Sequence, residues 1–290
     1  MCGLLGYFFD KSYYYNLDDF NSDLLLLNKR GPDYNNYYIN KTENISLYLG
    51  HTRLSILELS NLANQPFTDN NHALIFNGEI YNHMNLRIKI NNKNSIKSNS
   101  DTETLFYLLK NNNIENVLKK IEGMFAICFY DKIKNKLFLA RDRSGEKPLY
   151  IYLSKNCFGF TSDIATFKNN KNNNLSINTD SLGDYMNLQY IPAPKTIYKD
   201  CFKLPPGSLL EIDLNKFKFK HSISFQSLIN QEGVNFTKYW NLEFNKHIYR
   251  NKNYSEVKNT TEELIKKSVK KQMLSDVPLG AFLSSGVDSS

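Results

Sequence analysis

Short apolar runs separated by polar, turn-forming residues mark the first half of the chain and predict β-strands. Residues 1–9 form an apolar run of strand length, and residues 47–49 and 73–76 are shorter strand candidates between turns. Residues 124–130 and 136–140 are two further runs, and the polar residues between them predict a β-hairpin. We find no internal repeat, so the pattern does not indicate a repeat array.

Helices are predicted between these strands, where apolar residues follow capping residues. Their expected bounds are 18–28, 105–109 and 114–121. Gly31 and Pro32 follow the first helix in positions typical of a helix C-terminus. Ser100 and Glu103 have the spacing of a capping box ahead of the second helix. Strands followed by paired helices and more strands favour layered α+β packing over an alternating parallel sheet.

The second half of the chain is more polar. Residues 168–174 are expected to form a loop, and a Leu-Pro-Pro-Gly sequence leads into a strand over 208–212. Residues 215–253 are mixed and basic, contain Tyr239 and Trp240, and are interpreted as a connector.

A second structural unit is predicted near the C-terminus. Thr260 and Glu263 have capping-box spacing ahead of a helix that reaches about Met273, and residues 277–283 are an apolar strand candidate. The predicted domains are therefore residues 2–212, a connector over 213–258, and the start of a second domain over 259–290.

Composition places the chain among soluble globular proteins. The 290 residues suggest about two domains, and 41% hydrophobic and 22% charged residues are ordinary values. No apolar run approaches the ~18 residues of a membrane span, and no secretory leader pattern opens the chain. The net charge of +7 comes from lysines and arginines scattered among asparagines, without a basic stripe, so no nucleic-acid partner and no membrane partner is expected.

The four cysteines, at positions 2, 128, 157 and 201, form no C-x-x-C pair. Neither a zinc site nor a disulfide framework is therefore indicated, and no metal ligands are predicted. A reducing cytoplasm is the simplest location for such a chain.

Cys2 stands directly behind the initiator methionine and is the first candidate for catalysis. Removal of Met1 would give Cys2 a free α-amine as well as a thiol. An α-amine titrates near pH 7.7–8.0, so it can act as a general base beside the nucleophile at neutral pH. The structural alternative is a small buried cysteine on a first strand.

Further positions suit the hydrolysis of a glutamine side chain. Asn77 and Gly78 offer amide donors for an oxyanion, and Arg53 offers a guanidinium for the α-carboxylate. Glu79 and Asp101 offer carboxylates for the α-ammonium.

Each of these residues has a structural alternative when it is taken alone. Asn-Gly is a common hairpin turn, and Asp101 suits the first turn of a helix. Arg53 could form a surface ion pair, and Glu79 could be a solvated strand residue. Together with Cys2, the set favours catalysis. His51 is interpreted as structural, because an N-terminal nucleophile needs no Cys–His dyad.

Five motifs, taken in order, resemble the glutamine-hydrolysing asparagine synthetases. They follow the N-terminal Met-Cys-Gly and are GHTRLSI at 50–56, FNGEIYN at 76–82, SDTET at 100–104, ARDRSGEKPLY at 140–150 and FLSSGVDSS at 282–290. The resemblance covers essentially the whole chain.

The resemblance implies a four-layer αββα sandwich of the N-terminal-nucleophile hydrolase type over the first domain. It also implies Cys2 as nucleophile and Arg53, Asn77, Gly78, Glu79 and Asp101 as glutamine contacts. Residues 30–33 and 141–150 match the family as well, with expected roles in scaffolding the site and in the domain interface. In the second of these stretches, Ser144 and Glu146 replace an aromatic and an aliphatic residue.

The final motif resembles the pyrophosphate-binding loop of ATP pyrophosphatases, which begin an α/β domain. The expected ATP-binding residues are Leu283, Ser284, Ser285, Gly286, Val287, Asp288 and Ser289. Backbone N–H groups and hydroxyls would face the phosphates, and Asp288 would organise Mg²⁺. Ser285 stands where the family has its first glycine, so backbone approach there is less free.

The resemblance implies glutamine-dependent asparagine synthesis, with glutamine, aspartate and ATP as substrates. Ammonia released at Cys2 would pass to a second site and amidate aspartate activated as β-aspartyl-AMP. One strand and one helix cannot form that second domain, so the chain is expected to be a piece of a longer protein and at most a glutaminase. Two alternatives stay open: a sibling amidotransferase with another carboxylate acceptor, and a non-catalytic scaffold. The sequence also leaves the oligomeric state open, with a homodimer as one option.

Overall fold

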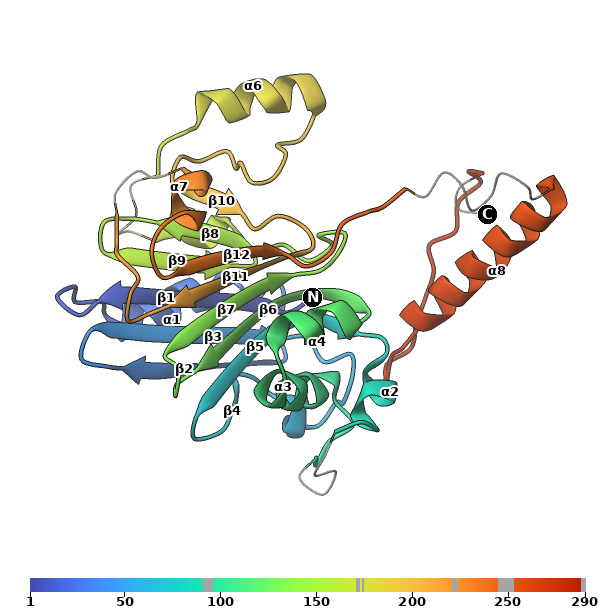
Figure 1. Cartoon of the computed structure of the whole chain (residues 1–290), viewed down its shortest axis with the longest axis horizontal. Helices are drawn as coiled ribbons and strands as arrows, with labels where there is room; N and C mark the ends of the chain where they lie inside the picture. The colour runs from blue at the N-terminus through green and yellow to red at the C-terminus, as the bar shows by residue number, and fades with distance from the viewer. Residues whose placement is uncertain (91–95, 171–172, 174, 221–223, 245–252, 288–290) are drawn as a thin grey trace.

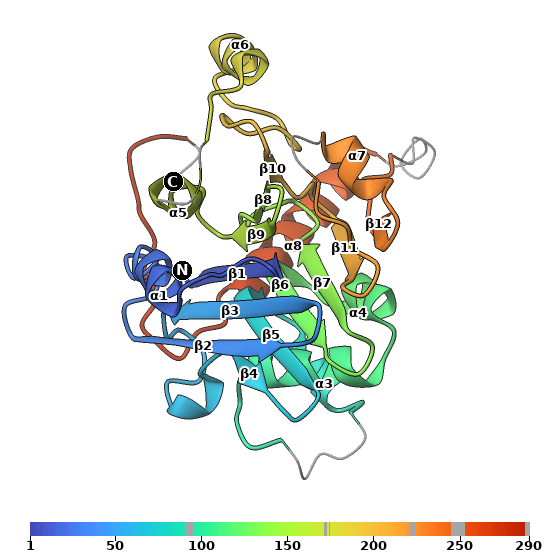
Figure 2. The same ribbon diagram turned by 90° about the vertical axis from the view of Figure 1, so that its left-hand side faces the viewer.

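Two antiparallel sheets of six strands each lie face to face in the computed structural model, with helices on their outer sides (Figures 1 and 2). The structure describes residues 1–90, 96–170, 173, 175–220, 224–244 and 253–287. Among the described helices, none is long and apolar enough to cross a membrane.

The first sheet has the strand order β10-β8-β9-β1-β3-β2. Its strands are β1 (Gly3–Asp10), β2 (Tyr34–Lys41), β3 (Ile45–Arg53), β8 (Tyr150–Leu153), β9 (Cys157–Thr161) and β10 (Cys201–Lys203). β1 pairs with β3 from Gly3 opposite Thr52 to Asp10 opposite Ile45. This register places Cys2 and Arg53 at the same end of the sheet.

The second sheet has the order β12-β11-β7-β6-β5-β4. Its strands are β4 (Phe67–Thr68), β5 (His72–Ile80), β6 (Gly123–Asp131), β7 (Lys136–Arg141), β11 (Ser208–Asp213) and β12 (Val234–Lys238). β5 pairs with β6 along its whole length, and its last four residues contain the Asn-Gly-Glu sequence singled out above.

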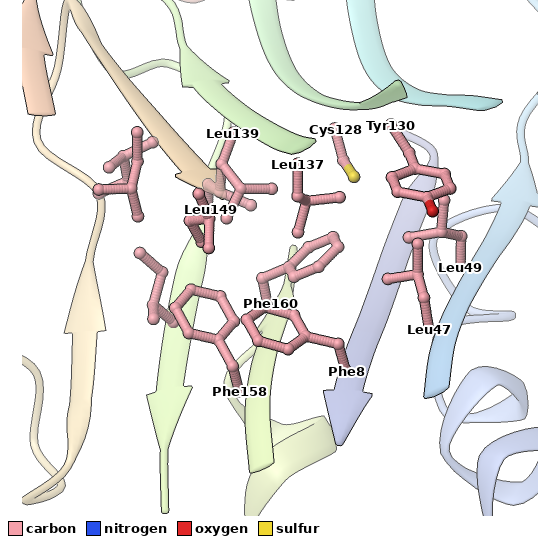
Figure 3. Close-up of a cluster of buried hydrophobic side chains, with 14 of the residues drawn as sticks. Phe8, Leu47, Leu49, Cys128, Tyr130, Leu137, Leu139, Leu149, Phe158 and Phe160 are labelled. Atoms are coloured by element: carbon pink, nitrogen blue, oxygen red, sulfur yellow. The ribbon is translucent and has the colours of Figure 1, made fainter. Parts of the chain in front are cut away.

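The main core fills the space between the two sheets. Phe8 and Leu47 point into it from the first sheet, and Cys128, Leu137 and Leu139 meet them from the second (Figure 3). All five side chains are essentially inaccessible to solvent, as expected for two sheets that pack by interdigitating their inner faces.

Each sheet is also covered on its outer face. Helices α1 (Leu17–Leu25) and α5 (Ala165–Asn169) pack over the first sheet, where Tyr7 and Phe9 meet Phe20 and Phe167. Helices α3 (Asp101–Asn111) and α4 (Ile114–Lys120) pack over the second sheet. The four-layer αββα sandwich is therefore confirmed. Burial on both faces explains why β1 is a continuous apolar run instead of an alternating one.

Several short elements and one long helix complete the described chain. They are a 3₁₀ turn (Asn61–Ala63), α2 (His83–Arg87), α6 (Thr179–Leu188), α7 (Phe225–Ile229) and α8 (Tyr254–Gln272). α8 stands away from the sheets and exposes most of its length to solvent (Figure 1).

All predicted strands except the one over 277–283 are confirmed, and so is the hairpin; β1 begins two residues later than predicted, and the others extend beyond their apolar runs. The predicted helices at 105–109 and 114–121 correspond to α3 and α4. α1 begins at Leu17, before the predicted residue 18, because the Asn16 side chain caps it by accepting the Asp18 N–H, and it ends at Leu25 instead of residue 28. The predicted capping box is only half formed: Ser100 caps α3, but Glu103 accepts the N–H groups of residues 97 and 98.

The connector predicted over 215–253 is wrong for its first part. α7 packs beside β12, and β12 pairs with β11 from Ser208 opposite Lys238 to Ile212 opposite Val234. As an edge strand with a largely exposed face, β12 carries too few apolar residues to stand out in the sequence. The strands β2, β4, β8, β9 and β10 were also not predicted.

Three predictions in the other polar segments need correction. Residues 168–169 end α5 and are not loop. α8 begins at Tyr254 instead of Thr260, because the Asn253 side chain accepts the Glu256 N–H at the same capping spacing. Residues 277–283 form no strand in the described structure, and Phe282 is fully exposed. A strand requires a paired neighbour, and an apolar run alone does not supply one.

Candidate active site

A cavity of about 90 Å³ lies where the ends of β1, β3 and β5 meet the start of α3. Its lining includes all six residues predicted for the site: Cys2, Arg53, Asn77, Gly78, Glu79 and Asp101. They come from four elements that are far apart in the sequence. His51 does not line the cavity; its ring contacts the Phe76 carbonyl at 3.1 Å, and burial lowers its pKa to about 3.

Cys2 is half-buried and contacts the chain just after Arg53. The Leu54 N–H points to Cys2 Sγ at 3.4 Å, and the thiol lies 3.7 Å from the Leu54 carbonyl oxygen. Burial raises the pKa of the Cys2 thiol, and the Leu54 N–H partly opposes that shift. With Met1 in place the thiol is thus held protonated, and a base is needed to activate it.

The guanidinium of Arg53 is held by uncharged oxygens. Nη1 donates to the Ser60 carbonyl at 2.8 Å and to Asn64 Oδ1 at 2.7 Å, and Nη2 donates to the carbonyls of Leu57 and Glu58. Among the described residues, no carboxylate is bonded to this guanidinium, so its positive charge is not neutralised by an ion pair. A fixed guanidinium of this kind, with its charge available, suits an incoming carboxylate.

The side chain of Asn77 is almost completely buried, and its Nδ2 has no hydrogen-bond partner among the described residues. A buried donor without a partner costs free energy unless a ligand satisfies it. Its position beside Cys2 in the cavity lining fits a donor to an oxyanion formed at the sulfur.

The Gly78 N–H points to the free edge of β5. In an extended strand the N–H groups of alternate residues point the same way. The N–H groups two residues before and after Gly78 bond to side chains: Phe76 N donates to Gln65 Oε1, and Ile80 N donates to Asp101 Oδ2. Between them Gly78 N–H therefore faces the cavity as a second donor. Glycine is required here because a Cβ would lie 2.0 Å from the Met124 carbonyl oxygen of β6.

Two carboxylates complete the polar lining. Asp101 is almost completely buried at the start of α3, and burial raises its pKa to about 6. Burial also raises the pKa of Glu79, and the nearby Lys147 charge partly opposes this shift. An ammonium group placed between the two carboxylates would stabilise their ionised forms.

Lys147 lines the cavity but was not predicted as a site residue. It is buried, its pKa is lowered by burial, and its Nζ donates to Met1 Sδ at 3.2 Å. Gln65 was also missed; it brackets the edge of β5 by bonding both the N–H and the carbonyl of Phe76. Lys147 lay within the 141–150 motif, which was its only sequence signal.

The loop that presents Lys147 is organised by Asp142. This buried carboxylate accepts the backbone N–H groups of Phe125, Ser144, Glu146 and Lys147. Because the loop is held through backbone groups, the unusual residues Ser144 and Glu146 leave its fold intact. The expected scaffolding role of residues 141–150 agrees with these contacts.

The Arg30–Asp33 stretch supports the first two site residues. Arg30 Nε donates to the Cys2 carbonyl at 3.2 Å, and Asp33 Oδ2 accepts the Ser55 N–H at 2.7 Å. Between them Gly31 packs against β3, where a Cβ would meet the Thr52 carbonyl oxygen at 2.3 Å.

The predicted nucleotide loop lies apart from this cavity. Residues 283–287 are exposed, and the Gly286 N–H donates to Ser284 Oγ at 3.2 Å. Asp288 and Ser289 lie outside the described residues. Over the part of the chain that the structure describes, no group of three or more His, Cys, Asp or Glu side chains is arranged to hold a metal ion.

Sequence comparison defines the class of protein to which this fold and this cavity belong. Residues 1–223 match the glutamine amidotransferase domain family, so the chain belongs to that family. Residues 260–290 match the asparagine synthase family.

Individual proteins named asparagine synthetase match this chain over its whole length. The chain is 35% identical to the putative asparagine synthetase (glutamine-hydrolyzing) 2 of Methanocaldococcus jannaschii, over 100% of this chain and 56% of that protein. It is 32% identical to asparagine synthetase (glutamine-hydrolyzing) 1 of Bacillus subtilis, over 100% of this chain and 43% of that protein. The chain thus spans about half the length of these relatives.

The fold is shared with more distant solved structures. A glutamine phosphoribosylpyrophosphate amidotransferase from B. subtilis superposes with a TM-score of 0.54 at 18% identity, covering 82% of this chain and 49% of that one. This likeness supports the sandwich of two sheets between helices.

Proposed function

We propose that this chain carries the glutamine-hydrolysing half of a glutamine-dependent asparagine synthetase. The observation that carries the proposal is a cavity lined by Cys2, Asn77 and Arg53. Among the described residues, Asn77 Nδ2 has no hydrogen-bond partner and the Arg53 guanidinium has no bonded carboxylate. A nucleophile, an oxyanion donor and a carboxylate clamp are the three parts that hydrolysis of a glutamine amide requires.

In this proposal Arg53 binds the α-carboxylate of glutamine, and Glu79 with Asp101 binds its α-ammonium. The Cys2 thiol then gives its proton to the α-amine of the same residue, and the sulfur attacks the amide carbon. Asn77 Nδ2 and the Gly78 N–H stabilise the resulting oxyanion.

Collapse of this intermediate breaks the C–N bond and completes the half-reaction. The protonated α-amine returns its proton to the leaving nitrogen, which departs as ammonia. Water then attacks the γ-glutamyl thioester, and glutamate and the free thiol are released. No cofactor takes part in these steps.

Met1 is the obstacle to this chemistry. It lines the cavity and blocks the Cys2 nitrogen in an amide bond. Its removal would vacate part of the cavity, free the α-amine and release Lys147 Nζ from the Met1 sulfur. We therefore propose that the active form begins at Cys2.

We place the amidotransferase domain at residues 2–240 instead of 2–212, because β12 completes the second sheet and Tyr239 donates to the Arg141 carbonyl at 2.7 Å. The second domain would begin with α8. In the complete protein it would use ATP and aspartate to form β-aspartyl-AMP, which ammonia converts to asparagine. We propose a cytoplasmic location.

The described part of the nucleotide loop fits a phosphate group in its chemistry. Residues 283–287 offer backbone N–H groups and two serine hydroxyls, which are the donors that phosphate-binding loops use. ATP would supply the activation of aspartate as an acyl adenylate, with Mg²⁺ accompanying its phosphates.

The proposed function is tested by glutamate and ammonia release from L-glutamine by the purified chain, after mass spectrometry has established that Met1 is absent. Cys2→Ala and a form with a blocked N-terminus should both release none. Cys157→Ala, which removes a buried thiol outside the cavity, is the matched control and should behave as the wild type. A folded, processed wild type that releases no glutamate would contradict the proposal.

A further inference from the structure

A short loop holds the Arg53 guanidinium in place. Residues 56–60, called the clamp loop here, wrap around the guanidinium, which donates to the carbonyls of Leu57, Glu58 and Ser60. Because these carbonyls set the position of the guanidinium, the geometry of the clamp loop determines where a substrate carboxylate can bind.

Glu58 is the central residue of the clamp loop. Its φ of +54° lies in the left-handed region, which a glutamate adopts only where other contacts hold it. Its carboxylate accepts the N–H groups of Asn99 and Ser60, and Asn99 lies two residues before Asp101. Glu58 thus connects the Arg53 side of the cavity with the start of α3.

One contact that holds Glu58 comes from the far end of the chain. Asp276 Oδ2 accepts the Glu58 N–H at 2.7 Å, and the Asp276 N–H donates to the Ile56 carbonyl at 2.9 Å. The first of these bonds joins residues 218 positions apart. Asp276 belongs to the segment that leaves α8, which passes beside α2 (Figure 1).

Asp276 is connected to the Arg53 guanidinium through Glu58, by two successive hydrogen bonds. The Asp276 carboxylate fixes the Glu58 peptide from its N–H side, and the carbonyl of Glu58 accepts from Arg53 Nη2. A left-handed residue has few ways to keep its carbonyl aimed at Arg53 once its N–H loses its acceptor. The loss of the Asp276 carboxylate would therefore move the guanidinium without removing any atom from the cavity.

We infer that Asp276 is a positioning residue for the Arg53 clamp, so that the segment following α8 sets the affinity of the cavity for the α-carboxylate of glutamine. This inference rests on the proposed function and adds to it a link between the two parts of the chain. Asp276 lies seven residues before Leu283, the first residue of the proposed nucleotide loop.

A second tether between the same parts provides a matched control. Lys271 on α8 pairs with Glu122, and both side chains are about half exposed. Neither Lys271 nor Glu122 belongs to the clamp loop or lines the cavity. Lys271→Ala therefore loosens the attachment of α8 and leaves the Glu58–Arg53 contact in place.

The experiment compares Asp276→Ala, Asp276→Asn and Lys271→Ala in glutamine hydrolysis. Asp276→Ala should raise KM for glutamine by about tenfold, the value of one charge-assisted hydrogen bond, with kcat changed much less. Asp276→Asn keeps an oxygen acceptor for the Glu58 N–H and should recover most of the affinity. Lys271→Ala should keep the wild-type KM.

Covalent labelling of Cys2 separates positioning from general damage. 6-Diazo-5-oxo-L-norleucine carries the α-carboxylate and α-ammonium of glutamine, whereas iodoacetamide carries neither. Asp276→Ala should slow labelling by the first reagent and leave labelling by iodoacetamide at the wild-type rate. Mass spectrometry of the N-terminal peptide measures both.

The outcomes separate the two proposals. An active wild type together with an Asp276→Ala variant of unchanged KM and labelling would overturn the inference alone. Equal losses with both reagents, or an equal loss in Lys271→Ala, would show a merely structural effect and also overturn it. A wild type that releases no glutamate would remove the proposed function, and the inference with it.

Discussion

The Asp101 carboxylate accepts the Ile80 N–H at 2.9 Å, which joins the first residue of α3 to the last residue of β5 inside the cavity. This bond replaces the ladder bond that Ile80 would make to a further strand. It also leaves a carboxylate in an almost completely buried position, where ionisation is costly.

Replacement of Asp101 by asparagine should stabilise the fold in a pH-dependent way. The pKa of Asp101 is about 6 in the folded chain, above its ordinary value near 3.8. Ionisation of Asp101 therefore destabilises the fold. This destabilisation is absent below about pH 4, grows between about pH 4 and 6, and is constant above pH 6, at up to about 3 kcal/mol. The substituted amide keeps an oxygen for the Ile80 N–H but cannot ionise.

Urea unfolding of the wild type and Asp101→Asn at pH 4, 5 and 7.5 measures this difference. The variant should be the more stable at pH 7.5, and the two proteins should converge at pH 4. A gap that does not change with pH would show that the burial of the charge is not its cause. Glutamine hydrolysis by the variant should be weak at every pH, because the carboxylate for the α-ammonium is lost.

Asn77→Ala should separate catalysis from stability. The Nδ2 donor has no partner among the described residues, so its removal breaks no bond that it makes there in the resting protein. We expect kcat for glutamine hydrolysis to fall by about 10²- to 10³-fold, the usual effect of losing one oxyanion donor. KM and the midpoint of thermal unfolding should change little. A large rise in KM with an unchanged kcat would place Asn77 in substrate binding instead.

Asn64→Ala should weaken glutamine binding without touching the nucleophile. Asn64 Oδ1 accepts from Arg53 Nη1 at 2.7 Å and helps to orient the guanidinium. We expect KM to rise several-fold with kcat largely retained, since Arg53 keeps its bonds to the clamp loop. Arg53→Lys should have the larger effect, because one ammonium with three donors cannot replace the guanidinium's four bonds to the surrounding oxygens and also bind a carboxylate. Steady-state kinetics of both variants measures the order.

Two glycine substitutions should have opposite effects on stability. In Gly31→Ala the new Cβ would lie 2.3 Å from the Thr52 carbonyl oxygen, so the backbone must shift, at a cost of roughly 1–3 kcal/mol. Gly183 lies within α6 with nothing within 4 Å of its Cβ position, and Gly183→Ala should stabilise by about 1 kcal/mol. Denaturant unfolding of the pair checks both signs. Gly31→Ala should also lower activity, because Arg30 and Asp33 hold Cys2 and the residues after Arg53.

Much of the candidate site could be predicted because its residues stand in short motifs whose chemistry is local. Cys2 follows the initiator, Asn77 and Gly78 are adjacent, and Asp101 follows its capping serine. The central strands were also predictable, because burial on two faces makes them continuous apolar runs. These are properties of neighbouring residues, which the sequence displays directly.

The tertiary structure decided what depends on remote neighbours. β12 is a strand because β11 pairs with it, and residues 277–283 are not, because no described strand lies beside them. The burial of Lys147 follows from the loop that Asp142 holds, and no local pattern shows it.

By itself, the sequence determined which chemical groups the chain brings to catalysis and in what order. The tertiary structure decided that four separate elements meet at one cavity and that the Asn77 amide is left there without a partner among the described residues. It also decided that Asp276 supports the loop around Arg53. The physical reason is that hydrogen bonding, burial and pKa depend on which atoms become neighbours, and folding alone sets those neighbours for residues distant in the chain.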